Sequence, residues 1–333
     1  MSGINVLVIG VGYFGRHHAR ILSELNARSP ATLPVIEKLI VTRTRLDRAK
    51  ATAAEIRNSI SCSVKTVIGA EVGNMRQLIS VLEQYHPGFT SITARDKEQG
   101  DSIHADYSIQ ALKYGAVLCE KPFSHASGDG SSLRYIDALQ GCRNAELFGL
   151  ELPLAVVARD ILKDPHLGKI MMQADRLEFY WEAWDRGKKK IIDDLGLHPW
   201  SLIPASFMVK ICQVEDRGTG ADLFLELYDR KTQRKRPCKI TLNIGAGFRG
   251  LQFDDMVIGF KKAASRIQLI KLDQPLDKAA KRGIKSLNGQ VMLAVDNPLE
   301  QNIVAALCHR PIVGLRRTQE SQLFLERLHG YRA

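Results

Sequence analysis

The feature that most constrains the fold is an apolar run that leads into a glycine-rich turn and then into a helix. Residues 4–9 are largely apolar and β-branched, as is typical of a parallel strand buried on both faces. The turn that follows is Gly10-Val11-Gly12-Tyr13-Phe14-Gly15, and residues 16–25 have a helical pattern. Between a strand and a helix, GxGxxG predicts a dinucleotide-binding unit, whereas elsewhere the same pattern is only a tight turn.

The positions of this turn have separate expected roles. We expect Gly10 to permit the tight turn, Gly12 to let a pyrophosphate approach the backbone, and Gly15 to allow close helix–strand packing. The helix N-terminus offers N–H groups and the positive end of its dipole to the phosphates. Tyr13 and Phe14 lie in the same turn, and we expect them to contact the cofactor.

Two adjacent histidines, His17 and His18, stand in the first turns of this helix. Adjacent helix positions do not share a face, so the two are not a metal-binding pair. We expect both to be exposed to solvent or to lie at the edge of the cofactor.

The segment after the second strand, residues 38–42, predicts which cofactor binds. It reads Thr42-Arg43-Thr44-Arg45, and no carboxylate follows until Asp47. A carboxylate here would bind a ribose 2′-hydroxyl and repel a 2′-phosphate, whereas an arginine flanked by hydroxyls would bind the phosphate. We therefore expect NADP in preference to NAD, bound by Thr42, Arg43, Thr44 and Arg45. The alternative is that both arginines only open the helix 46–57 on its solvent side.

Strands and helices alternate up to a lysine at residue 121. This alternation predicts a doubly wound parallel sheet. Lys121 follows the apolar run 116–119 and precedes Pro122, at the carboxyl end of a strand, where open α/β sheets bind ligands. The alternative is a lysine that only caps a strand before a turn. The further expected elements are strands at 66–68 and 89–94 and helices at 74–85 and 101–114, the last ended by Gly115 at its C′ position.

The second half of the chain has the pattern of a different fold class. Apolar and polar residues alternate, for example over 221–227, which predicts an antiparallel sheet with one face on helices and one open. The predicted chain is thus an N-terminal α/β Rossmann domain, 1–123, and an α+β domain, 124–333. The expected strands are 145–150, 170–181, 207–215, 222–229, 238–244, 255–261 and 266–272, and the expected helices are 133–139, 154–162, 298–309 and 318–328.

The net charge and the cysteine content indicate which kinds of partner and which cell compartment to expect. The formal net charge of +11 favours anionic partners, and a phosphate-bearing cofactor is sufficient to use it. The basic residues are scattered without aromatic platforms, so we expect no nucleic acid. The six cysteines are widely separated and lack zinc spacing, which indicates reduced thiols in the cytoplasm and no metal. No apolar segment has the length of a membrane span.

Asp194 and His198 are spaced i, i+4. In a helical turn both side chains would lie on one face, and a carboxylate beside an imidazole suits general acid/base chemistry. The alternative from spacing alone is a surface Asp–His pair.

Four stretches together resemble the glucose–fructose oxidoreductase and inositol dehydrogenase family, often called Gfo/Idh/MocA. The glycine turn runs into Arg16 and His18-Ala19, and Ile103-His104 precedes a helix that ends in Lys113-Tyr114-Gly115. Residues 117–123, Val-Leu-Cys-Glu-Lys-Pro-Phe, look like the family's most diagnostic stretch, and residues 194–198 look like its D-x-G-x-H motif.

The resemblance implies a fold, a reaction and a set of site residues. It implies NAD(P)-dependent hydride transfer, with Lys121, Asp194 and His198 as the catalytic set. His198 would be the acid/base, Lys121 would stabilise charge on the reacting oxygen, and Asp194 would orient His198 or the substrate. Glu120 would support the cofactor or the turn. Thr93 is a further expected cofactor contact, although it stands where the family often has a Thr-Pro sequence that this chain lacks. A cis Lys121-Pro122 peptide and a homodimer or homotetramer through the open-faced sheet are also implied.

The chain departs from the family pattern around its expected substrate pocket. Lys188, Lys189 and Lys190 stand where the family has glycines, and Ser201 replaces an acid. The three lysines could recognise an anionic small molecule or form a solvated loop. The expected substrate is a sugar-like alcohol or ketone, or an imine. The alternative function is a dinucleotide-binding sensor or partner subunit without turnover.

Overall fold

The computed structural model describes residues 3–28, 32–94, 103–183, 195–283 and 289–331. It forms two compact units, each of which draws on three segments of the chain. The predicted domain boundary after residue 123 stays a prediction, and the units group later segments with the N-terminal one. The first unit comprises Met1–His125, Ser131–Glu151 and Leu299–Gln322, and the second Ala126–Gly130, Leu152–Pro298 and Leu323–Ala333.

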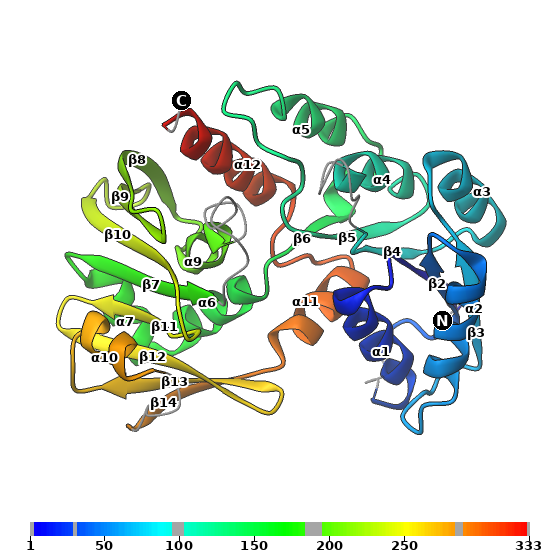
Figure 1. Ribbon diagram of the computed structural model, residues 1–333, viewed down its shortest axis with the longest axis horizontal. Helices are drawn as coiled ribbons and strands as arrows, with labels where there is room; N and C mark the ends of the chain where they lie inside the picture. The colour runs from blue at the N-terminus through cyan, green and yellow to red at the C-terminus, as the bar shows by residue number, and fades with distance from the viewer. Residues whose placement is uncertain (1–2, 29–31, 95–102, 184–194, 284–288, 332–333) are drawn as a thin grey trace. The chain divides into compact units, whose positions relative to one another are not determined.

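The first unit contains a six-stranded sheet with the order β3-β2-β1-β4-β5-β6 (Figure 1). All of its strand pairs are parallel, which confirms the predicted doubly wound sheet. The order reverses between β1 and β4, and ligands of such sheets bind at the carboxyl ends of the strands there. The strands are β1 (Ile4–Ile9), β2 (Ile36–Arg43), β3 (Thr66–Glu71), β4 (Phe89–Ile92), β5 (Ala116–Glu120) and β6 (Phe148–Glu151).

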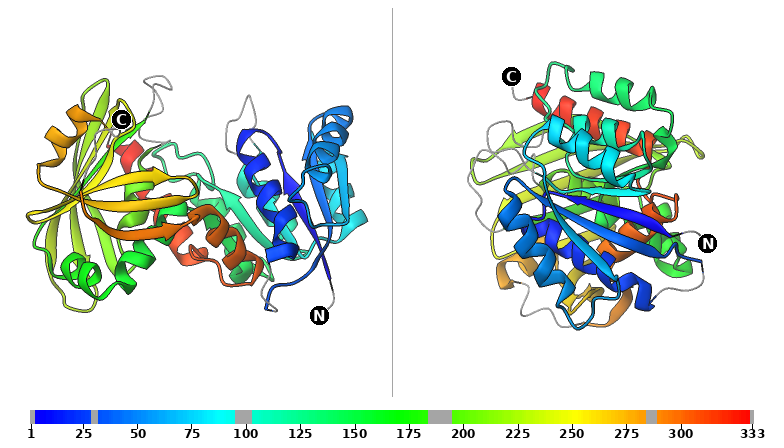
Figure 2. Two further views of the ribbon diagram at one scale, coloured as in Figure 1. Left: turned by 90° about the horizontal axis from the view of Figure 1, so that it is seen from below. Right: turned by 90° about the vertical axis from the view of Figure 1, so that its right-hand side faces the viewer.

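Helices lie on both faces of this sheet (Figure 2). On one face α1, α2 and α11 share a core with β1 and β2 that includes Val8, Leu22 and Ile303. On the other face α3, α4 and α5 follow one another. The helices are α1 (Tyr13–Arg28), α2 (Leu46–Arg57), α3 (Met75–Tyr85), α4 (Ile103–Ala111), α5 (Leu133–Gln140) and α11 (Pro298–Leu307), and Ala145–Leu147 forms a short 3-10 helix. Helix α12 (Leu315–Gly330) is divided between the two units after Gln322.

The second unit contains an eight-stranded sheet with the order β14-β13-β12-β11-β7-β10-β9-β8. Within this second sheet, only the β10–β7 pair is parallel among the strand pairs that the described residues form, which confirms the mainly antiparallel prediction. The strands are β7 (Leu177–Ala183), β8 (Phe207–Asp216), β9 (Gly220–Asp229), β10 (Lys235–Ile244), β11 (Arg249–Phe253), β12 (Met256–Ala263), β13 (Arg266–Leu272) and β14 (Val291–Asp296).

The alternating pattern of β9 matches its burial. Leu223, Leu225 and Leu227 are buried on one face, as the period of two predicts. On the opposite face of the sheet, α10 packs on β11 to β13 through a small core that includes Phe248 and Ile270. The helices of this unit are α6 (Pro153–Lys163), α7 (Pro165–Gln173), α9 (Leu197–Leu202) and α10 (Leu276–Arg282).

The predicted strand over residues 170–181 is wrong at its start. Helix α7 runs to Gln173, and β7 begins only at Leu177. Asp164 caps the helix by accepting hydrogen bonds from the amides of His166 and Leu167, and Pro165 is pre-organised for the first helical position. The Asp-Pro pair is therefore a helix-start signal that outweighs the apolar residues after it. The prediction also missed β11, β14 and α10.

Glycine is required at position 115 for a reason other than the predicted helix cap. It lacks the positive φ of a left-handed helix cap. A Cβ at this position would lie 2.3 Å from the carbonyl oxygen of Gly88, so the glycine permits close backbone packing.

Among the described residues, no helix is long and apolar enough to cross a membrane. No group of three or more His, Cys, Asp or Glu side chains in the same ranges is placed to hold a metal ion.

Candidate cofactor and active site

Two glycines of the turn are required by the packing around them. Gly10 has a φ of +83°, and a Cβ there would lie 2.3 Å from the Cα of Ala94. A Cβ at Gly15 would lie 2.5 Å from Thr93 Oγ1 and 2.6 Å from the carbonyl oxygen of Gly10. Both separations are shorter than any van der Waals contact, so the turn holds this shape only with glycine at these two positions.

Gly12 differs from these two because no described residue crowds it. The atom nearest to a Cβ there would be the Gly10 carbonyl oxygen, at 3.9 Å. Its missing side chain therefore leaves open space beside the N-terminus of α1, whose first turn holds no acidic residue. An anionic pyrophosphate fits this arrangement, since the first amides of a helix have no partner within the helix.

Two buried threonines brace the turn. Thr42 Oγ1 accepts a hydrogen bond from the Gly10 amide at 3.2 Å. Thr93 Oγ1 lies 3.1 Å from the carbonyl oxygen of Ile9 and 3.0 Å from that of Gly10, to which it donates. Both hydroxyls therefore shape the glycine turn, and the predicted contact of either with the cofactor stays a prediction.

The two aromatic residues of the turn are open to solvent. Tyr13 is 78% exposed and Phe14 is 37% exposed. The rings of Tyr13 and Phe14 meet edge to face, and Tyr13 also meets the ring of His17 in this way. They form an exposed aromatic rim at the start of α1, in the place where the sequence predicts cofactor contacts.

The two arginines after β2 differ in their charge environment. Arg45 makes two hydrogen bonds to Asp47, at 3.1 and 2.7 Å, so its charge is already paired. Arg43 Nη1 donates to the carbonyl oxygen of Val11 at 2.7 Å, within the glycine turn. Among the described residues no carboxylate pairs with Arg43. The free positive charge at the end of β2 is therefore that of Arg43, while Thr44 beside it is exposed.

Lys121 lies at the carboxyl end of β5 and is 8% exposed. The Lys121-Pro122 peptide is cis, as the resemblance implied. Glu120 before it is also buried and pairs in register with Glu151 of the neighbouring strand β6. Two carboxylates thus stand side by side at this edge of the sheet.

The expectation for His18 is wrong, because this histidine is fully buried. Its Nδ1 lies 2.7 Å from Ser91 Oγ, and its Nε2 lies 2.8 Å from a carboxylate oxygen of Glu151. Helical periodicity could have predicted this, since His18 shares the buried face of α1 with Gly15 and Leu22. Its ring joins α1 to β4 and β6.

His198 lies in α9 of the second unit and is half-buried. Its ring stacks on the buried indole of Trp181, with centroids 5.8 Å apart and planes 19° from parallel. The guanidinium of Arg249 lies 4.8 Å from the centre of the same indole. Asp194, with Lys188 to Lys190, lies outside the described residues, so its pairing with His198 stays a prediction. Lys121 and the glycine turn belong to the first unit.

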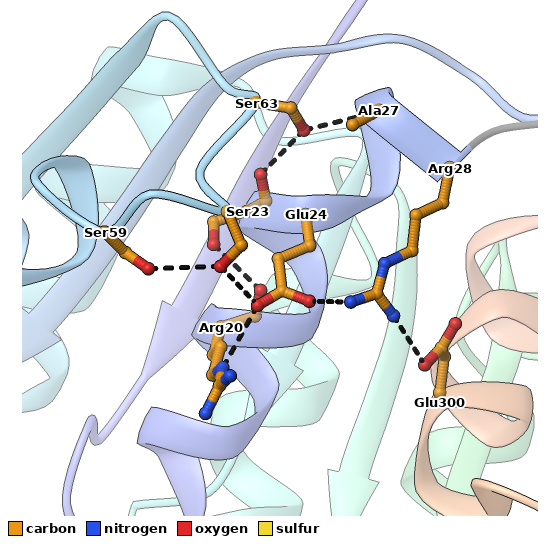
Figure 3. A network of polar contacts seen from close by, with 9 residues as sticks. Arg20, Ser23, Glu24, Ala27, Arg28, Ser59, Ser63 and Glu300 are labelled. Carbon is orange, nitrogen blue, oxygen red and sulfur yellow. Dashed lines mark hydrogen bonds and ion pairs between the residues drawn. The ribbon is translucent and has the colours of Figure 1, made fainter.

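A second polar network lies where α1 ends, at the amino ends of the strands (Figure 3). Glu24 is buried and accepts hydrogen bonds from Arg20 at 3.0 Å, from Ser61 at 2.7 Å, and from Arg28. Burial alone would raise the pKa of Glu24, but the hydrogen bond from Ser61 and the two arginines outweigh it and lower the pKa. Arg28 also reaches Glu300 of α11 at 3.6 Å.

Residues 4–143 match the model of a family described as oxidoreductases with an NAD-binding Rossmann fold, GFO_IDH_MocA. The match contains the glycine turn, the residues after β2 and Lys121. It confirms the family resemblance for this part of the chain. No curated protein matches the chain at a significant level.

Solved structures show the same fold over the whole chain. An NAD-binding oxidoreductase from Klebsiella pneumoniae has a TM-score of 0.64 at 12% identity, with 99% of this chain and 97% of that chain covered. Levoglucosan dehydrogenase in complex with NADH has a TM-score of 0.65 at 10% identity, with coverages of 99% and 97%. At such low identity these likenesses show the fold alone.

Proposed function

We infer from the membership of residues 4–143 in the GFO_IDH_MocA oxidoreductase family that the chain is an enzyme that binds a nicotinamide dinucleotide and transfers a hydride. The observation that carries this proposal is the glycine turn. Packing demands glycine at positions 10 and 15, whereas the described residues leave space beside Gly12 that an incoming ligand can use. Bound there, the cofactor supplies or accepts the hydride through its nicotinamide ring.

The cofactor that we propose is NADP. A 2′-phosphate requires a positive charge at the end of β2, and Arg43 supplies one that no carboxylate among the described residues neutralises. A 2′-hydroxyl would instead call for an acidic acceptor, which the segment 42–45 lacks. The structurally similar levoglucosan dehydrogenase is a complex with NADH, which makes NAD the competing choice.

The proposed chemistry assigns one role to each site residue. Oxidation of an alcohol removes a hydride from carbon and a proton from oxygen. His198 accepts this proton in its neutral form and returns it in the reverse direction. Lys121 donates a hydrogen bond to the reacting oxygen and stabilises its developing negative charge. Asp194 orients the ring of His198 or the substrate.

The proposed substrate is a sugar-like alcohol or ketone, with an imine as the chemical alternative. One similar structure is levoglucosan dehydrogenase in complex with NADH and L-sorbose. The alignment covers 97% of that protein's chain at a TM-score of 0.65. The net charge of +11 favours an anionic member of the class, such as a sugar acid or sugar phosphate. We propose a homodimer or homotetramer through the second sheet, which sedimentation analysis would test.

The alternative function is a dinucleotide-binding sensor without turnover. Such a protein needs the glycine turn and Arg43 but has no use for a lysine at the end of β5. The burial of Lys121 at the end of β5 favours the enzyme, because burying an ammonium is costly and a protein that only binds the dinucleotide would gain nothing from it.

The test is a turnover assay with NADP(H) and NAD(H) over a panel of sugars, sugar acids, sugar phosphates and cyclic imines. The proposal expects hydride transfer with at least one class, and faster transfer with NADP(H). Tight NADPH binding by fluorescence titration, with no turnover on any class, would support the sensor instead.

A further inference from the structure

A histidine next to the proposed site is held between two backbone carbonyl groups. His104 lies in the first turn of α4 and is fully buried. Its Nδ1 lies 2.8 Å from the carbonyl oxygen of Pro122, and its Nε2 lies 2.7 Å from that of Ala94. Both distances are those of good hydrogen bonds.

Both partners of this ring can only accept a hydrogen bond. A carbonyl oxygen has no proton to give, so each contact needs an N–H on the imidazole. A neutral ring has one N–H, whereas an imidazolium has two. Only the imidazolium makes both bonds at once, and losing the bond to Pro122 leaves a buried carbonyl group without this donor.

The two carbonyl groups belong to the two parts of the proposed site. Pro122 directly follows Lys121, so its carbonyl group is anchored one residue away from the proposed catalytic lysine. Ala94 directly follows Thr93 and packs against the glycine turn, where a Cβ on Gly10 would lie 2.3 Å from its Cα. The ring therefore connects the segment that carries Lys121 to the segment that contacts the cofactor turn.

We propose that His104 is a positioning residue: its hydrogen bond to the Pro122 carbonyl group holds the Lys121 turn in place, and its bond to Ala94 ties the ring to the segment beside the glycine turn. This inference rests on the proposed function, since it assumes that Lys121 acts on the reacting oxygen. His104 does not touch the reactants. It acts through backbone placement, and a displacement of about 1 Å at a reacting group can lower a rate by about 10²-fold.

The variants that test this role separate the two hydrogen bonds. His104→Phe keeps the ring volume and removes both donors. The amide of His104→Asn can place an N–H near the position of Nδ1, and that of His104→Gln can place one near Nε2. His104→Asn should therefore keep the bond to Pro122, and His104→Gln the bond to Ala94.

The expected result is a split between these three variants. On a slow substrate, where chemistry limits turnover, His104→Phe should lower kcat by about 10²-fold. His104→Asn should recover a large part of this loss and His104→Gln should not, while KM for NADP changes little in either. Equal kcat in the Asn and Gln variants, or near-normal kcat in the Phe variant, would overturn the inference.

A double variant separates failure of this inference from failure of the proposed function. If His104 acts through Lys121, adding His104→Phe to Lys121→Ala should not lower the residual turnover further. A full second loss in the double variant would overturn the positioning role. Normal turnover in Lys121→Ala with His104 intact would instead overturn the proposed role of Lys121.

Amide hydrogen exchange gives a readout that needs no turnover. Exchange over residues 119–124 should rise in the Phe and Gln variants and stay near wild type in the Asn variant, because only the last holds the Pro122 carbonyl. The same exchange in all three would overturn the inference. Thermal unfolding of each variant shows whether the global fold is kept.

Discussion

The two edges of the first sheet treat charge in opposite ways. At the amino edge, where α1 ends, the buried Glu24 is neutralised by Arg20 and Arg28 and hydrogen-bonded to Ser61 (Figure 3). At the carboxyl edge, where α1 begins, Arg43 has a carbonyl partner and no carboxylate among the described residues. Satisfied charge stabilises the fold, whereas a cation left without a counter-charge is available to a ligand.

The comparison assigns function to the carboxyl edge and stability to the amino edge. Substitutions at the carboxyl edge should change turnover or cofactor choice and leave the free energy of unfolding nearly unchanged. Substitutions at the amino edge should lower the free energy of unfolding and leave turnover and cofactor choice nearly unchanged.

Lys121→Ala should lower kcat by about 10²–10³-fold, as expected for the loss of one donor to a developing oxyanion. Cofactor affinity should stay within a few-fold, because we place Lys121 at the reacting oxygen and not at the pyrophosphate. Steady-state kinetics and NADPH titration measure the two effects. A parallel loss of NADPH binding and turnover would make Lys121 a cofactor residue.

Arg43→Asp should reverse the cofactor preference. It removes a charge-assisted bond to the 2′-phosphate and adds an acceptor for a 2′-hydroxyl, a change of about 10–100-fold in relative affinity. The matched control is Arg45→Ala, whose charge is already paired with Asp47 and whose loss should leave the preference unchanged. Fluorescence titration with NADPH and NADH measures both. Equal affinities for the two cofactors in the wild type would contradict the proposed preference.

Glu24→Gln should destabilise the fold without affecting cofactor binding. The expected loss is about 1–2 kcal/mol in the free energy of unfolding, because one charged acceptor is lost while both arginines stay more than half exposed and solvated. Denaturant unfolding measures it, with Arg45→Ala as a control at the other edge. Weakened NADPH binding in Glu24→Gln, with unfolding unchanged, would break the comparison.

The stability difference between wild type and Glu24→Gln should depend on pH. The folded protein lowers the pKa of Glu24, so the carboxylate stabilises the fold fully above its unfolded pKa, about 4.3. This stabilisation is lost as the pH falls through the lower, folded pKa. The two proteins should therefore differ at neutral pH and converge in acid. A difference in unfolding free energy that stays constant down to acid pH would remove the charge as its cause.

The prediction of the fold succeeded best in the parallel sheet. Strands β4, β5 and β6 are buried along their whole length, and helix α2 begins and ends where the sequence pattern does. In the second unit the errors fall where local signals compete, as at α7, where an N-cap and a proline precede apolar residues that resemble a strand. Short strands such as β11 carry too few residues to show a period.

The sequence by itself determined the nucleotide-binding turn, the class of the sheet that carries it, and the position of Lys121 at a strand end. These follow from spacing along the chain, since the turn and its flanking strand and helix are contiguous. Three features needed the folded structure: no described carboxylate pairs with Arg43 while Arg45 is paired, His18 is buried against Ser91 and Glu151, and His104 bridges two carbonyl groups. The environments of His18 and His104 depend on contacts between segments far apart in sequence. All three features depend on where each side chain points once the strands are in register, and the spacing of residues along the chain does not encode that direction.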